Sequence, residues 1–166
     1  MVIRGNHDDE ALFDRAFTDW QPVRDIEGLR FVCFRDWLAA DRSPVRGDAN
    51  RARFLAAVDD ADSPAQIHVQ HYMIDPPTFA SGWKYEYVDA ADYRDRINAS
   101  GRVAAVLSGH YHPGSHLVSP EGVHYSVPKA FTSAPHPFRI VEVAVSGGSA
   151  RVVGIGDRSA ENGGAG

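Results

Sequence analysis

The chain has 166 residues, a mass of 18.1 kDa and a formal net charge of −5, and 43% of its residues are hydrophobic. This composition is that of an ordinary globular domain, and it excludes collagen-like, coiled-coil and wholly disordered chains. No stretch reaches the ~18 apolar residues that a membrane span needs, and the acidic balance argues against nonspecific nucleic-acid binding. Cys33 is the single cysteine, so a disulfide scaffold and a cysteine-rich zinc site are also excluded.

The first residues of the chain are typical of the end of a strand rather than its beginning. Val2 and Ile3 match the last residues of a buried strand, and Gly5-Asn6 matches the turn after it. We therefore expect that residues upstream of Met1 belong to the same domain and are missing here. A signal peptide would show a basic segment followed by an apolar one, and this pattern is not seen. The expected location is therefore the cytoplasm.

Strands and helices are expected to alternate along the first part of the chain. Asp8 or Asp9 can cap a short first helix, and Asp48 a second helix that ends before Pro64. Prolines 76 and 77 interrupt regular structure, so residues 76–88 form a loop that can cover a site. The pattern further predicts a helix over 89–97 and strands over 29–34, 67–70 and 103–107.

After residue 110 the pattern changes to an antiparallel meander. The predicted strands cover 115–118, 123–127, 138–145 and 150–155, and Gly147-Gly148 forms a two-residue hairpin turn. The fold class is therefore α/β, with one domain over residues 1–156. Residues 157–166 are polar and glycine-rich, which predicts a flexible tail.

Eight histidines are the unusual feature of the composition, and four of them follow predicted strands. His7 follows the first strand, His71 the 67–70 strand, and His110 and His112 the 103–107 strand. Ligands of open α/β sheets gather outside the carboxyl ends of the strands, so these imidazoles are expected to share one site. A glycine precedes the first and the last of these motifs and permits close backbone approach.

The types of residue in this set indicate a metal site. In an extended chain His110 and His112 would point the same way, roughly 6.6 Å apart, so that each can serve one of two ions ~3.5–4 Å apart. Asn6 offers an amide oxygen, and imidazole and oxygen donors without thiolate indicate Zn, Mn or Fe. Asp8 stands beside His7 and is a candidate to fix its tautomer.

Three motifs in this order resemble those of the calcineurin-like metallophosphoesterases. Gly5-Asn6-His7-Asp8 is similar to the GNH[D/E] motif, His71 to the isolated histidine, and Gly109-His110-Tyr111-His112 to the GHxH motif. The resemblance covers residues 2–155 and is carried by the ordered set, because GNHD alone is a weak signal. It implies the αββα sandwich of that family.

The resemblance also implies roles for individual residues. Two divalent metal ions would be held by an amide oxygen and imidazoles, with Asn6, His71 and His110 on one ion and His112 on the other. His7 would contact the scissile phosphate and protonate the leaving oxygen, with Asp8 as its hydrogen-bond partner. The implied reaction is hydrolysis of a phosphomonoester or phosphodiester by a metal-bound hydroxide. The expected partner is a small phosphoester, for which a nucleotide is one candidate; no nucleic acid is expected, and the oligomeric state stays open.

The chain departs from the family because the DxH and GDxxD motifs that precede GNHD are absent. Residues 47–51 begin as Gly-Asp, but Arg51 stands where the second aspartate would be. The ion assigned to His112 would keep only that ligand, and the carboxylate that bridges both metals is lost. Three explanations compete: a piece of the catalytic domain, which we favour, a noncatalytic remnant that acts as a binding module, or a site completed by a partner chain. A mononuclear hydrolase that uses only Asn6, His71 and His110 is a weaker alternative.

Several other side chains are weaker candidates. The 76–88 loop carries Lys84 and two aromatic neighbours, Trp83 and Tyr85, which can contact a substrate base or simply pack within the loop. Arg139 is a candidate phosphate contact on a predicted strand. The remaining histidines are expected to be structural or exposed: His68, His116, His124 and His136.

Overall fold

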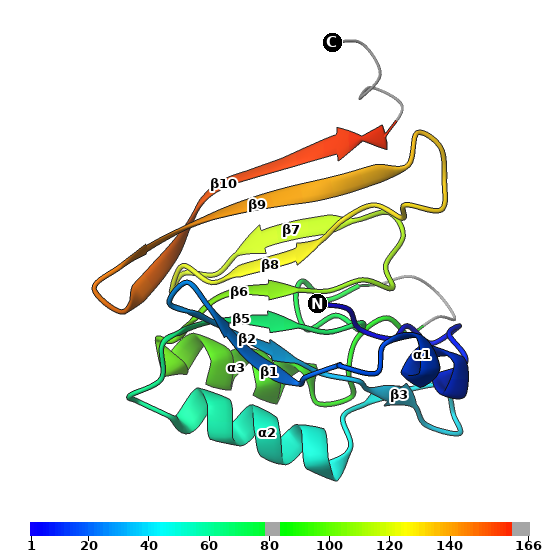
Figure 1. Cartoon of the computed structure of the whole chain (residues 1–166), viewed down its shortest axis with the longest axis horizontal. Coiled ribbons are helices and arrows are strands. Elements are labelled where there is room, and N and C mark those ends of the chain that lie inside the picture. Colours follow the sequence, from blue (N-terminus) through cyan, green and yellow to red (C-terminus); the bar gives the residue numbers. More distant parts are fainter. Residues whose placement is uncertain (79–83, 161–166) are drawn as a thin grey trace.

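The computed structural model describes residues 1–78 and 84–160, which form an α/β domain around one mixed sheet (Figure 1). Within this part of the chain the sheet has the strand order β1-β2-β5-β6-β8-β7. Strands β2, β5, β6 and β8 run parallel, and β1 and β7 are antiparallel at the two edges. Their bounds are β1 Val23–Ile26, β2 Leu29–Cys33, β5 Ala65–Val69, β6 Val103–Leu107, β7 Ser115–Val118 and β8 His124–Val127. The predicted α/β class, with alternation first and antiparallel strands afterwards, is confirmed.

Two layers cover the sheet (Figure 1). Helices α2 (Asp48–Asp59) and α3 (Ala90–Ser100) lie on one face, and a hairpin of β9 (Pro137–Ser146) and β10 (Ser149–Ser159) lies on the other. Helix α1 (Glu10–Ala16) and the short ribbon of β3 (Trp37–Leu38) and β4 (Pro44–Val45) stand at one end of the sheet. No helix among the described residues has the length and apolar character that a membrane crossing requires.

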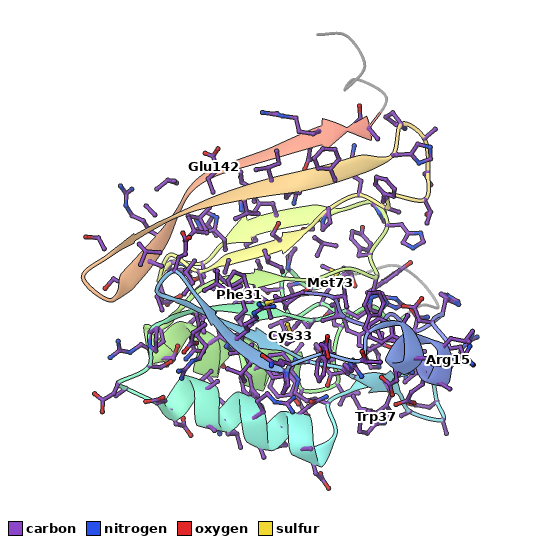
Figure 2. The ribbon with its side chains drawn as sticks, viewed as in Figure 1. Arg15, Phe31, Cys33, Trp37, Met73 and Glu142 are labelled. Atoms are coloured by element: carbon purple, nitrogen blue, oxygen red, sulfur yellow. The ribbon has the colours of Figure 1, made fainter. Side chains whose placement is uncertain are left out.

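The central strands are buried on both faces, as the alternation of side chains along a strand requires. On β2, Val32 packs with the helices, whereas Phe31 packs with the hairpin. On β6, Val106 packs with the helices and Ala105 with the hairpin. Cys33, labelled with Phe31 in Figure 2, is buried, and burial raises the pKa of its thiol to about 11. Its unreactive position agrees with the sequence, which indicates a small apolar core residue.

Local signals correctly placed the start of α1 and the turn of the β9–β10 hairpin, whereas the helix expected over 89–97 is α3, Ala90–Ser100. The Asp9 carboxylate accepts a hydrogen bond of 2.9 Å from the Leu12 amide and caps α1 as predicted. At α2 the cap is Gly47, and Asp48 is the first helical residue, so the predicted cap is one residue late. Gly147 and Gly148 have φ of 57° and 77° and turn the β9–β10 hairpin, which confirms the predicted turn.

Two predictions about the ends of the chain are wrong. Val2 and Ile3 belong to no strand, and the Val2 carbonyl instead accepts a hydrogen bond of 2.8 Å from the Trp20 indole. Residues 157–159, expected in the tail, belong to β10, because Asp157 pairs with Arg139 across the hairpin. Residues 161–166 of the expected tail lie outside the described residues.

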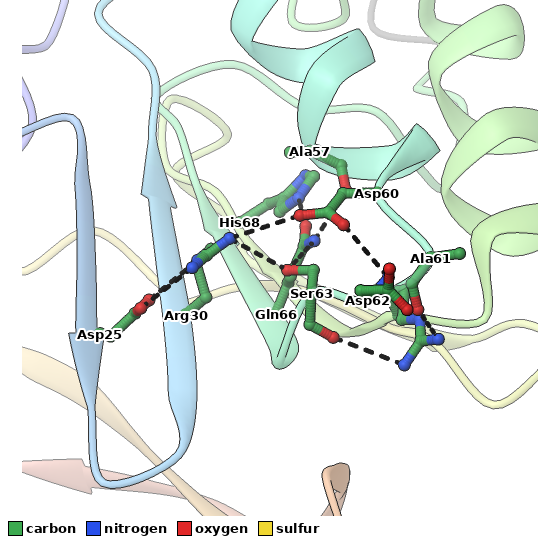
Figure 3. Close-up of polar contacts among 10 residues, drawn as sticks. Asp25, Arg30, Ala57, Asp60, Ala61, Asp62, Ser63, Gln66 and His68 are labelled. Atoms are coloured by element: carbon green, nitrogen blue, oxygen red, sulfur yellow. Dashed lines mark hydrogen bonds and ion pairs between the residues drawn. The ribbon is translucent and has the colours of Figure 1, made fainter.

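A polar network joins the start of β5 to the end of α2 (Figure 3). The Gln66 amide donates to the Ala57 carbonyl at 2.7 Å and to the Ser63 hydroxyl at 3.0 Å. Its amide oxygen is 2.8 Å from Nε2 of His68, whose ring is fully buried against Phe34. His68 is therefore a structural residue of the core, as expected from its position on the strand.

Candidate functional site

A pocket of about 440 Å³ opens at the carboxyl ends of β5 and β6. These strands are parallel neighbours, so the segments that follow them meet at one edge of the sheet. The N-terminal turn reaches the same edge. The pocket is lined by residues from the three motifs and one from the 76–88 loop: Gly5, Asn6, His7, Asp8, His71, Tyr85, His110 and His112. All six residues that the sequence singles out therefore lie together.

His71 is at the centre of this arrangement. Its Nε2 is 2.8 Å from Oδ1 of Asn6, and its ring centroid is 4.9 Å from that of His110. Burial, and secondarily the neighbouring charge of His110, lower the pKa of His71 to about 4. Burial also lowers the pKa of His110, although a hydrogen bond with the Lys84 backbone partly opposes this shift. Both rings are therefore neutral near pH 7, which is the form that can bind a metal.

The backbone at His110 turns sharply, so the extended geometry expected for the GHYH segment is wrong. His110 has φ of 65°, in the left-handed region, and the Tyr111 amide donates to the Gly109 carbonyl at 2.7 Å. This tight turn redirects the chain between His110 and His112. A non-glycine residue in this region costs ~1–3 kcal/mol, and such strain is concentrated at functional sites.

Asp8 supports the N-terminal turn. Its Oδ2 accepts a hydrogen bond of 2.7 Å from the Gly5 amide. Among the hydrogen bonds of the described residues none joins Asp8 to His7, although the sequence suggests that pairing. His7 itself is exposed at the pocket. Asp8 thus fixes the backbone that presents Asn6 and His7.

Gly5 and Gly109 both lie against the His71 ring, near its Cε1 and Nδ1 atoms. A Cβ on Gly5 would stand 3.0 Å from Cε1 of His71, and one on Gly109 would stand 3.3 Å from Nδ1. The expected close approach of both glycines is therefore present, and its object is the His71 imidazole.

Gly5→Ala is accordingly expected to lower the free energy of unfolding by about 1 kcal/mol, at the low end of overpacking costs. Gly5 has no positive φ, so without the contact to His71 alanine would instead stabilise the protein by ~0.4–1 kcal/mol through the unfolded chain. Gly156→Ala is the control, because its Cβ would meet only the Arg158 guanidinium at 3.5 Å. Urea unfolding of both variants measures the sign of the change in the free energy of unfolding. A stabilised Gly5→Ala variant would contradict the tight contact with His71.

A buried polar network, which the sequence did not indicate, lies directly behind the pocket. Gln70 precedes His71, and its Oε1 accepts a hydrogen bond of 2.7 Å from Arg46. The Gln70 amide donates to the Tyr72 carbonyl at 2.8 Å and to the Ser108 hydroxyl at 3.4 Å. The network thus connects the segments that carry His71 and His110. In the sequence, the sign of this network was a glutamine directly after an apolar strand, and that pattern is too common to identify a network.

Other predicted candidates lie away from the pocket or have structural partners. The Lys84 ammonium is 2.8 Å from Asp41, and this bond is the main cause that lowers the pKa of that carboxyl. Arg139 donates to Asp157 and to main-chain carbonyls of the sheet, so the expected phosphate contact is wrong. His136 Nδ1 is 2.8 Å from the Phe131 carbonyl. Trp83 lies outside the described residues.

The donors of the pocket fit part of a metal site. The Asn6 oxygen and the His71 nitrogen converge to 2.8 Å, so one small cation can be bound by both, and amide and imidazole donors suit borderline divalent ions. Within residues 1–78 and 84–160, however, no three or more His, Cys, Asp or Glu side chains form a group that could hold a metal ion. The pocket therefore presents donors for one ion, and the carboxylate in its lining, Asp8, already accepts a hydrogen bond from the Gly5 amide.

Comparison with known proteins adds little to this description. No protein-family model and no curated protein matches the sequence. Among solved structures, a dimetal phosphatase from Danio rerio is similar with a TM-score of 0.46 and 11% identity. The similarity covers 53% of this chain and 28% of that chain, so it spans less than a third of the phosphatase. A likeness at this level does not establish a family.

Proposed function

We propose that this pocket is the site of a metal-dependent phosphoesterase of the calcineurin-like kind. The observation that supports the proposal is the convergence of Asn6, His71, His110 and His112 on one pocket, together with His7. These residues come from three separate segments of the chain, which are the segments that carry the three ordered motifs. Chance placement of four imidazoles and an amide around one 440 Å³ pocket is a poor alternative.

In this proposal Asn6, His71 and His110 hold one divalent ion, and His112 extends toward a second. A bound Mn, Fe or Zn ion supplies positive charge at the phosphate and lowers the pKa of a water molecule. The protein's own part is to keep the imidazoles neutral, which the burial of His71 and His110 favours. The carboxylates of a complete binuclear site would come from outside the described residues.

His7 is the proposed acid of the reaction. It is exposed at the pocket, where a phosphoester can reach it, and the Asp8-stabilised turn fixes its backbone. Proton donation by a positioned imidazole to the leaving oxygen contributes ~10²–10⁴-fold to the rate. The substrate in this proposal is a small phosphomonoester or phosphodiester.

The test combines metal content with hydrolysis. Purified protein is loaded with Mn²⁺ or Zn²⁺, and bound metal is measured by mass spectrometry for the wild type, His71→Ala and His110→Ala. We expect metal in the wild type and its loss in both variants, while His136→Ala, outside the pocket, retains it. Hydrolysis of bis-p-nitrophenyl phosphate should fall by ~10²–10⁴-fold in His7→Ala with metal content unchanged. Wild-type protein without metal would contradict the proposal.

A second candidate function is a noncatalytic binding module. It is favoured by one observation, the lack of a three-residue His, Cys, Asp or Glu metal group in the part of the chain that the structure describes. In that case metal-loaded protein would bind phosphoesters without hydrolysing them. Turnover that depends on His7 would exclude this alternative.

A further inference from the structure

We propose that a second cavity beside the pocket binds the organic group of the phosphoester together with a second anionic group. This inference rests on the proposed function and adds a substrate class to it: a nucleotide-sized ester with an apolar body and a second phosphate or carboxylate. The position of the cavity, its lining and its charge favour such a ligand.

The cavity, which we call the hairpin groove, has a volume of about 810 Å³. His112 lines both the groove and the 440 Å³ pocket, so the two are adjacent and meet at a proposed metal ligand. The rest of the lining comes from the segment after β8 and from both strands of the hairpin: Lys129, Ala130, Ser133, Ala134, Pro135, Pro137, Phe138, Asp157, Arg158 and Ser159. A group attached to a phosphate in the pocket can therefore extend past His112 into the groove.

The wall of the groove is largely apolar. Ala134, Pro135 and Pro137 present aliphatic surface, and Phe138 exposes 41% of its surface although it is a large aromatic residue. An exposed aromatic ring in a concave surface offers a stacking platform for a flat apolar group. Cavities of ~300–1,000 Å³ with mostly apolar walls and a few polar groups are typical of small-molecule sites.

The charge of the groove is positive, because its carboxylate is already neutralised. Both oxygens of Asp157 accept hydrogen bonds from Arg139, at 2.6 and 3.0 Å, and this contact lowers the pKa of Asp157. Lys129 and Arg158 are exposed in the lining, and neither forms an ion pair with another described residue. Two cationic side chains beside an apolar wall favour a ligand that carries a second anionic group in addition to its scissile phosphate.

The groove is held in place by the residue that was expected to contact phosphate. Nη1 of Arg139 on β9 donates to the Ser115 carbonyl at 2.8 Å and to the Val127 carbonyl at 3.1 Å, which fixes the hairpin to β7 and β8. The Ala130 amide donates to the His112 carbonyl at 3.1 Å and fixes the other wall to the pocket. A preformed site avoids the cost of ordering on binding.

The experiment measures binding without turnover. The full chain in EDTA is titrated with ADP, adenosine and pyrophosphate by isothermal calorimetry. We expect ADP to bind more tightly than either fragment, because only ADP combines an apolar body with anions. The double variant Lys129→Ala/Arg158→Ala should weaken ADP binding by at least about tenfold. Arg151→Ala, at the other end of β10, should leave it unchanged.

The outcomes separate this inference from the proposed function. ADP binding that is lost in the double variant supports the groove even if the wild type hydrolyses no phosphoester. ADP that binds no better than adenosine, or equally well to the double variant, overturns the groove even if metal-dependent hydrolysis is found. His71→Ala, which is expected to lose metal, should retain ADP binding in EDTA.

Discussion

Replacing Arg46 with methionine is expected to lower the free energy of unfolding by about 3–5 kcal/mol, the cost of removing one partner from a buried ion pair. The side chains of Arg46 and Asp36 are both fully buried, and Nε of Arg46 is 3.3 Å from Oδ2 of Asp36. Arg46 also donates to Gln70 and to the Tyr87 hydroxyl, and its guanidinium lies 3.8 Å from the centre of the Phe34 ring. Methionine keeps much of the packing but leaves the aspartate charge without its cation.

The loss is expected to shrink when both charges are removed. In Asp36→Leu/Arg46→Met neither charge of this pair remains, and such replacements of buried ion pairs are often close to neutral. A double-mutant cycle by urea unfolding measures the coupling between the two residues. If the double variant were as unstable as the sum of the single ones, the ion pair would not be the cause of the loss.

The Arg46→Met variant also tests how the pocket is held in place. Gln70 is 2.7 Å from Arg46 and immediately precedes His71, so the loss of Arg46 removes one fixed contact behind the proposed metal ligand. We expect weaker metal binding in Arg46→Met even at temperatures where the protein remains folded. Unchanged affinity would mean that the main-chain bonds of the strand ends suffice to position His71.

The sequence predicted those features that depend on local signals. A continuous apolar run gave β6 with its observed bounds, 103–107, and the turn residues on both sides gave β7 with its observed bounds, 115–118. The gathering of His71 and His110 followed from a general rule about parallel strands, whereas His7 reaches the same pocket from a segment that no strand precedes. Local pattern and sheet topology were therefore enough to locate the pocket.

Features that depend on distant partners could not be predicted. Arg46 meets Gln70 across 24 positions and Tyr87 across 41, and each is an ordinary polar residue in its own segment. The left-handed backbone of His110 has no sequence signal, because only a small share of non-glycine residues adopt that region and the strand before it suggests continued extension. The polar composition of residues 157–159 concealed a strand that is held by its pairing with β9.

The second large effect concerns the acid stability of the core and depends on His68. Its ring is fully buried, Nδ1 has no hydrogen-bond partner in the described structure, and Nε2 bonds Gln66. Burial, and secondarily the charge of Arg46, lower the pKa of His68 to about 3. In the unfolded chain a histidine titrates near ~6.5, so between these values the unfolded state binds a proton that the folded state does not.

Stability should therefore fall as the pH is lowered through this window, and His68 should account for about 1.4 kcal/mol per pH unit of the slope below pH ~6. His68→Phe removes this part of the slope, although it adds a pH-independent loss because the Gln66 oxygen is left unpaired. Phe54→Leu is the control, since it disturbs packing against the same ring without removing a titrating group. Urea unfolding from pH 7 to 4 should give parallel curves for Phe54→Leu and the wild type and a shallower one for His68→Phe. An unchanged slope in His68→Phe would mean that the buried ring takes up a proton in the folded state, with Gln66 or a water molecule stabilising the charge.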